Sequence, residues 1–151
     1  MGIRRWVGFA LIAAGCRTGR INVDEHVRIE SASVICTHKG LGYTTASAYG
    51  EFGRADTAGA NMRVLNASDC EVITDIMNRA RKSRHRQTKM GGGWIFIRAS
   101  YSRSPYSSGV RLVACRTQQG GWVIDLTRLV NYEISQEADA EWLSKLDSAC
   151  P

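Results

Sequence analysis

The stretch that decides the fold is VRLVACRTQQGGWVIDL, residues 110–126. Residues 110–117 alternate bulky side chains in the manner of a half-buried strand, and Trp122 opens a second apolar run that ends at Leu126. Between the two runs stand two glutamines and two glycines, a composition that suits the loop of a β-hairpin. The stretch therefore predicts two antiparallel strands joined by a short turn.

Other segments extend this hairpin into a sheet. Residues 94–103 form another alternating run on its N-terminal side. Residues 27–37 are rich in β-branched side chains, and residues 42–53 contain several tyrosines and threonines, so each predicts a strand. Residues 62–65 predict a further short one. We expect an antiparallel sheet of about five strands.

A central helix is expected after the short strand at residues 62–65. The order Ser68-Asp69-Cys70-Glu71 has the composition of a capping box, in which the serine oxygen and Glu71 satisfy amide groups of the first turn. The apolar stripe that follows consists of Val72, Ile73, Ile76, Met77 and Ala80. On the same helical wheel Arg84 takes the next core position, so the later turns should project beyond the core. The helix should end before the three glycines at residues 91–93.

A second helix is expected at the C-terminus, where Ser135 can cap a run through Ser148. Its buried side consists of Trp142, Leu143 and Leu146. The sequence shows no internal repeat and no second domain. It predicts an α+β fold, an antiparallel sheet with one central helix and one C-terminal helix on one face, over a single domain at residues 27–151.

Composition places the chain among globular proteins. It has 151 residues, 44% hydrophobic and 23% charged, with a formal net charge of +6. These figures exclude a collagen-like or generally disordered chain. No stretch approaches the roughly 18–20 apolar residues that a membrane helix needs, which excludes a protein with several such spans.

The N-terminus has the pattern of an export signal. In MGIRRWVGFALIAAGC, residues 1–16, two arginines precede an apolar run too short to span a bilayer. Residues 12–16 resemble the lipobox of bacterial lipoproteins, with Ala13 where leucine is commonest. The resemblance implies a signal peptide at residues 1–15, a lipid on Cys16 and a tether at residues 16–26. It implies a cell-envelope protein, anchored in a membrane by its lipid and facing the periplasm or the cell surface. The alternatives are a plain secretory signal and a buried N-terminal segment whose cysteine is incidental.

Cysteine usage fits an exported protein. With Cys16 taken by lipid, four cysteines remain, namely Cys36, Cys70, Cys115 and Cys150. An even set in an exported chain predicts two disulfides, and three connectivities stay open. The alternative is four reduced thiols in the core. No clustered Cys/His spacing is present, so we expect no metal and no cofactor.

Positive charge is concentrated in the middle of the chain. Between Asp75 and Asp125 there is no acidic residue, whereas residues 133–147 are rich in acids. This interval predicts a basic surface for an anionic partner. Its candidate binding residues are Arg79, Arg81, Lys82, Arg84, Arg86, Lys89 and Arg98. The alternatives are a solvated helix end paired with the acidic segment, and a nucleic-acid surface. Export argues against nucleic acid.

No catalytic signature stands out, so no catalytic residue is assigned and a binding module is the leading hypothesis. An inhibitor or immunity protein and an envelope-assembly accessory are both compatible with it, the partner being a protein or an anionic envelope component. One alternative is a secreted basic hydrolase acting on RNA, with His38, His85, Lys89 and Glu51 as an acid–base set. Another is a lectin-like carbohydrate-binding domain, because residues 112–126 resemble half of a cyanovirin-type repeat. The second repeat of that fold is not visible, and the central helix is foreign to it.

Overall fold

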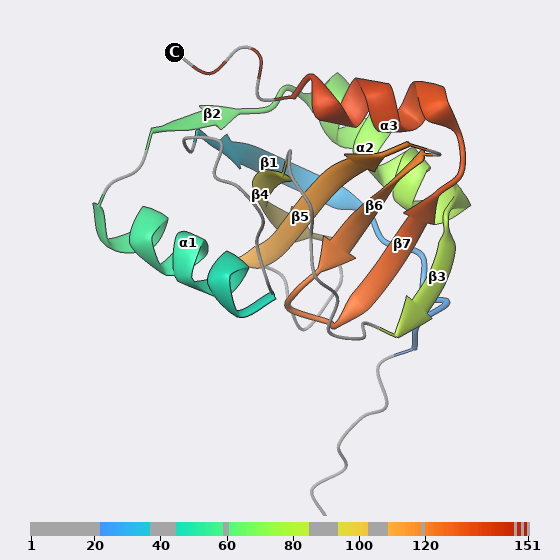
Figure 1. Cartoon of the computed structure of the whole chain (residues 1–151), viewed down its shortest axis with the longest axis horizontal. Coiled ribbons are helices and arrows are strands. Elements are labelled where there is room, and N and C mark those ends of the chain that lie inside the picture. Colours follow the sequence, from blue (N-terminus) through green and yellow to red (C-terminus); the bar gives the residue numbers. More distant parts are fainter. Residues whose placement is uncertain are drawn as a thin grey trace, which may run out of the picture.

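The computed structural model describes residues 22–36, 45–58, 61–84, 94–102, 109–118, 120–146, 148 and 150. These residues form one antiparallel sheet of seven strands, ordered β2-β1-β4-β5-β6-β7-β3, and three helices (Figure 1). The strands are β1 (Ile29–Ile35), β2 (Met62–Val64), β3 (Arg81–Arg84), β4 (Trp94–Tyr101), β5 (Val110–Thr117), β6 (Gly120–Asp125) and β7 (Val130–Ile134). The helices are α1 (Thr45–Ala58), α2 (Ala67–Arg79) and α3 (Glu137–Ser144). The predicted α+β class is confirmed, with more strands and one more helix than expected. Among the described residues, no helix has the length and apolar character to cross a bilayer.

The predicted hairpin lies at the centre of the sheet as β5 and β6. Cys115 pairs with Trp122 and Thr117 with Gly120, so the hairpin turns between Thr117 and Gly120. Both positions after the turn need glycine, because backbone carbonyl groups lie where a side chain would begin. A Cβ on Gly120 would lie 2.1 Å from the carbonyl oxygen of Ile134, and one on Gly121 would lie 2.5 Å from that of Cys115.

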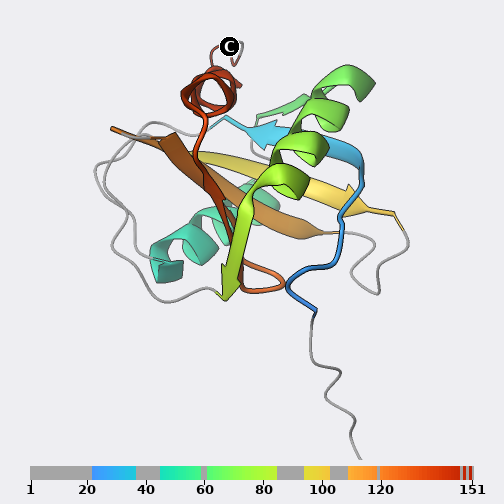
Figure 2. The same cartoon turned by 90° about the vertical axis from the view of Figure 1, so that its right-hand side faces the viewer.

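Helices cover both faces of the sheet: the two predicted helices, α2 and α3, share one face as expected, and the additional helix α1 covers the other. Figure 2 shows α2 and α3 on one side and α1 on the other. The core divides accordingly: Ile97 of β4 lies in the cluster with α2 and α3, whereas its neighbour Phe96 lies in the cluster with α1. Adjacent strand residues point to opposite faces, so both faces of the central strands are apolar.

Helix α1 replaces the strand predicted at residues 42–53. Ala48 and Phe52, one helical turn apart, are fully buried, and the Phe52 ring meets that of Phe96 edge-on with centroids 5.4 Å apart. Tyrosine and threonine favour strands only weakly, and here tertiary packing of one helical stripe overrides them.

Helix α2 is shorter than predicted at its C-terminal end. Ile73, Ile76 and Met77 are buried as expected, but the helix ends at Arg79 because Ala80 adopts an extended conformation. The next residues form β3, which pairs with β7, Arg81 opposite Glu133. Pairing with β7 takes the basic residues out of the helix and sets Arg81 opposite the one acidic residue of that strand.

The caps of α2 and α3 also differ from the prediction. Asn66, not Ser68, is the N-cap of α2, and its side chain accepts a hydrogen bond of 2.8 Å from the amide of Asp69. Helix α3 begins after Gln136 without a side-chain cap, so Ser135 does not cap it. Leu143 is buried as predicted. Of the other two residues predicted for its buried side, Leu146 is buried, whereas Trp142 is half-buried.

The cap assignment predicts a difference between two alanine variants. Asn66→Ala should lower the free energy of unfolding by about 1 kcal/mol, because it removes the acceptor of a first-turn amide. Ser68→Ala should change it by only a few tenths of a kcal/mol, since alanine is favoured inside a helix. Urea unfolding of both variants checks this, and an equal loss in the two would contradict the observed cap.

One disulfide is present where two were predicted. Cys36, just after β1, is bonded to Cys150, 114 residues later. Cys70 and Cys115 are free and buried. They cannot pair because Cys70 lies in the core on the α2 side of the sheet and Cys115 in the core on the α1 side. For these two residues the alternative of reduced core thiols is correct.

Candidate functional site

The predicted basic residues fall on two separate parts of the sheet. Arg79 ends α2, and Arg81, Lys82 and Arg84 lie on the edge strand β3. Arg98 lies on β4, and β7, β6 and β5 separate these two strands. Four strand spacings amount to roughly 19 Å. Arg86 and Lys89 lie outside the described residues. We therefore define the basic edge as Arg81, Lys82 and Arg84 and treat Arg98 apart from it.

Acidic side chains compensate part of the charge next to the basic edge. The Nε of Arg79 lies 2.8 Å from Asp75, and its Nη1 lies 3.1 Å from Asp139 at the start of α3. These hydrogen bonds raise the pKa of Arg79. Arg116 similarly lies 3.0 Å from Glu137. Acidic residues at the start of α3 thus compensate the positive charges of Arg79 and Arg116.

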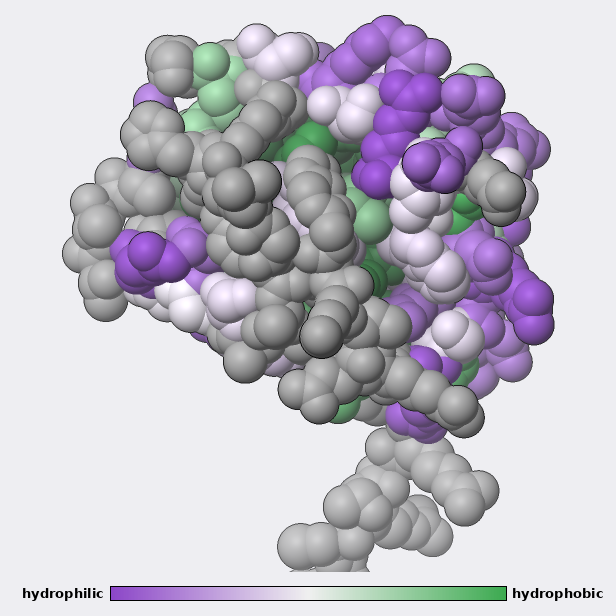
Figure 3. All heavy atoms as spheres, in the orientation of Figure 1, coloured by the Kyte–Doolittle hydropathy of each residue, from purple (hydrophilic) through white to green (hydrophobic). Residues whose placement is uncertain are grey.

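The basic edge itself stays more exposed. The side chain of Arg81 is 85% exposed, and its only ion pair among the described residues is a long one, 4.0 Å to Glu133. Arg84 is exposed. Figure 3 shows hydrophilic side chains gathered on the side of the molecule where β3 and β7 lie. Of the predicted basic residues that the structure describes, Arg81 and Arg84 are the best placed to meet an anionic partner.

Lys82 connects the basic edge with the beginning of the described chain. It stands opposite Tyr132 and so shares the sheet face of α2 and α3. Burial lowers the pKa of Lys82, Asp24 raises it and Arg128 lowers it. The ammonium group therefore lies in the field of both the N-terminal segment and the turn between β6 and β7.

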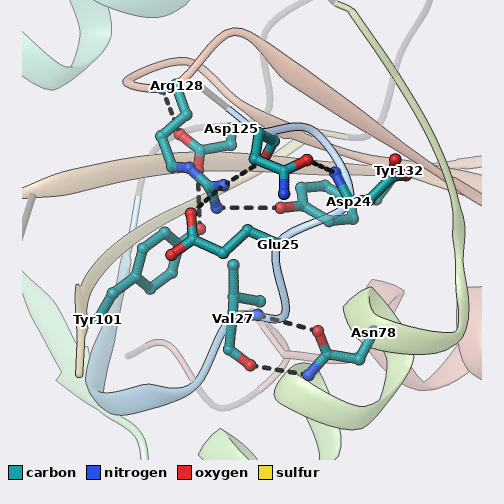
Figure 4. A network of polar contacts seen from close by, with 9 residues as sticks. Asp24, Glu25, Val27, Asn78, Tyr101, Asp125, Arg128 and Tyr132 are labelled. Carbon is teal, nitrogen blue, oxygen red and sulfur yellow. Dashed lines mark hydrogen bonds and ion pairs between the residues drawn. The ribbon is translucent and has the colours of Figure 1, made fainter. Parts of the chain in front are cut away.

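That turn is held by a buried carboxylate. Asp125 accepts hydrogen bonds of 2.9 Å from the hydroxyl of Tyr101 and from the amides of Thr127 and Arg128 (Figure 4). Burial raises the pKa of Asp125, and the three hydrogen bonds oppose this. Both oxygens of the carboxylate are engaged, one with the amides of the turn and the other with Tyr101 at the end of β4, two strands away.

Arg128, also buried, fastens the N-terminal segment to the same turn. Its Nη2 lies 3.2 Å from the carboxylate of Glu25 and 3.4 Å from the carbonyl oxygen of Asn22, and Nη1 lies 3.4 Å from the hydroxyl of Tyr132. The guanidinium also lies over the Tyr101 ring, 5.8 Å from its centroid. Burial raises the pKa of Tyr132 to about 12, so this hydroxyl stays protonated at neutral pH.

Hydrogen bonds from two side chains of α2 hold the same N-terminal segment. The side chain of Asn78 accepts from the amide of Val27 at 3.0 Å and donates to its carbonyl oxygen at 2.7 Å. The amide of Ile29 donates to the hydroxyl of Thr74 at 3.1 Å. Residues 22–26, assigned to the tether from the sequence, thus continue into a segment that is fixed to the body from Asn22 onward.

The tip of the turn carries an unusual residue. Leu129 has a φ of +57°, the only positive φ of a non-glycine residue in the described ranges. Its side chain is 48% exposed. Val130, the next residue, pairs with Arg84 of the basic edge. An exposed leucine therefore stands between the buried Arg128 and the basic edge.

A groove of about 850 Å³ lies elsewhere, between β1 and α2. The charged residues that line it are Arg28, Glu30, Glu71 and Asp75. Three of the four are acidic, so the groove has the wrong sign for an anionic ligand and forms no part of the basic edge.

The residues of the alternative hydrolase are not brought together by the described part of the structure. His38, His85 and Lys89 lie outside the described ranges, and Glu51 of α1 forms an ion pair with Arg54. Within those ranges, no group of His, Cys, Asp and Glu side chains could hold a metal ion.

Asp125, Arg128 and Leu129 were missed by sequence reasoning. A signal for the first was present, because an aspartate at a strand end often accepts hydrogen bonds from amides two and three residues later. Leucine in a left-handed conformation has no such signal.

No family model, curated protein or solved structure matches this chain.

Proposed function

We propose that the protein is an exported lipoprotein, anchored in the cell envelope through a lipid on Cys16. The observation that supports this most is the disulfide between Cys36 and Cys150, since such bonds persist in oxidising compartments outside the cytosol. The lipobox-like residues 12–16 and the short apolar run before them supply the anchor. The domain then faces the periplasm or the cell surface.

The domain acts as a binding module, and its basic edge meets an anionic partner. Arg81 and Arg84 are exposed on a strand with no neighbour on its outer side among the described residues. Their positive field attracts anionic groups and weakens as salt is added. The partner is a protein with an acidic patch or an anionic component of the envelope. Either partner is compatible with an inhibitor or immunity protein and with an envelope-assembly accessory.

Metabolic labelling with an alkyne fatty acid tests the anchor. The wild-type protein should take up the label, and Cys16→Ala should not, because the thiol that carries the lipid is missing. Cys115→Ala serves as the matched control, since this buried cysteine belongs to the folded domain and its loss should leave labelling intact. An unlabelled wild-type protein would overturn the proposal.

A further inference from the structure

Three features of different kinds meet at one end of the molecule. The first is the start of the described chain, where the carbonyl oxygen of Asn22 accepts from Arg128. The second is Leu129, the exposed residue that follows Arg128. The third is the basic edge, since Arg84 pairs with Val130 and Lys82 lies in the field of Asp24. Figures 1 and 2 both show the β6–β7 turn, the end of β3 and the N-terminal segment at this end.

Leu129 is unfavourable in its place for two reasons. A left-handed conformation suits glycine or asparagine and strains leucine through its Cβ. The exposed half of the side chain also forgoes burial. The turn that Asp125 and Arg128 fix accounts for the left-handed backbone at this position but does not require a leucine there, and an exposed apolar residue under strain at the tip of a fixed turn is a candidate for a contact outside the molecule.

The charges around Leu129 suit an anionic surface. Arg81, Lys82 and Arg84 are basic, whereas Asp24 and Glu133 oppose them, and Glu25 is engaged by Arg128. Charged residues on an edge strand also prevent unwanted pairing of sheet edges. That role accounts for the basic edge alone and leaves the exposed leucine beside it unexplained.

The proposed anchor lies within short reach of this end. Six residue steps separate Cys16 from Asn22. Even fully extended they span at most roughly 20–22 Å. A lipid on Cys16 therefore keeps the β6–β7 turn close to the bilayer surface.

We propose that Leu129 and the basic edge form a membrane-contact face, with Leu129 entering the headgroup region of a bilayer that contains anionic lipid. The inference rests on the proposed lipid anchor and names the anionic partner of the basic edge as the membrane itself. The lipid holds the domain at the bilayer, and each Lys or Arg near an anionic lipid surface adds to the attraction, which favours the orientation that turns the basic edge toward the membrane. Contact at this end directs α3 and the opposite end of the sheet away from the membrane.

A spin label at position 129 tests the contact. In Leu129→Cys the introduced thiol is the reactive one, because Cys16 carries lipid, Cys36 and Cys150 are bonded, and Cys70 and Cys115 are buried. Glu137→Cys, at a 76% exposed side chain of α3, is the matched control. The lipidated full-length mature protein is reconstituted into vesicles of phosphatidylcholine alone or mixed with phosphatidylglycerol. Collisions of each label with oxygen and with a water-soluble nickel chelate are then measured.

With phosphatidylglycerol present, the label at 129 should lose nickel collisions several-fold and gain oxygen collisions, while the label at 137 should not change. Adding Lys82→Gln and Arg84→Gln to the labelled protein, or raising the salt, should reverse most of this shift. Intact mass of the same sample reports the lipid. A sample without lipid overturns the proposed function, whereas a lipidated sample whose label at 129 remains as accessible to nickel as that at 137 overturns the membrane-contact face alone.

Discussion

Replacing Asp125 by alanine is expected to lower the free energy of unfolding by about 3–5 kcal/mol, because it leaves buried polar groups without a partner. The carboxylate accepts from the hydroxyl of Tyr101 and from two turn amides, and it lies near the buried guanidinium of Arg128. Bulk water does not reach these groups in the folded protein, since Asp125 and Tyr101 are both buried. Urea unfolding followed by tryptophan fluorescence measures the loss.

Two further variants separate the buried network from charge in general. Asp125→Asn retains an acceptor oxygen and should lose less than Asp125→Ala. Asp75→Ala removes an exposed carboxylate whose ion-pair partner, Arg79, keeps Asp139, and should cost no more than about 1 kcal/mol. If Asp125→Ala were as mild as Asp75→Ala, the network would not be what fixes the β6–β7 turn.

Loss of the disulfide should be of similar size. Cys150→Ser opens a closed loop with a sequence separation of 114 residues. The chain-entropy model assigns such a loop about 4–5 kcal/mol of stabilisation, through the unfolded state. Unfolding of wild type and Cys150→Ser, each with and without a thiol reductant, measures it.

The reductant provides the internal control. Reduced wild type should unfold at the same urea concentration as Cys150→Ser, and reductant should leave the variant unchanged. Cys115→Ser should retain the wild-type response to reductant, whatever its own packing defect, because Cys115 is not bonded. A wild-type protein insensitive to reductant under unfolding conditions would contradict the assigned bond.

The central strands were predictable because their pattern is local. Residues 94–101 and 110–125 combine bulky side chains with a loop of favourable composition, and each pairs with a neighbour close in sequence. The two misjudged segments depend on distant partners. Residues 81–84 become a strand because they pair with β7, about 50 residues later, and residues 45–58 become a helix because Phe52 packs on Phe96.

The candidate site was predictable only in its charge. Composition along the chain locates the basic interval, but not which of its residues are compensated by α3 or how far β3 lies from Arg98. The disulfide pairing depends on which face of the sheet each cysteine occupies. Leu129 could not be found at all, since its conformation and exposure follow from the turn that Asp125 and Arg128 hold together.

The disulfide also determines how the domain would respond to force. A pull between a membrane anchor at the N-terminus and something bound beyond Cys150 would enter at Asn22, run along β1 to Cys36 and cross directly to Cys150. Residues 37–149 lie off this covalent path. Tension would therefore break the hydrogen bonds of Arg128 and Asn78 to residues 22–27 first, while most of the sheet carried no load.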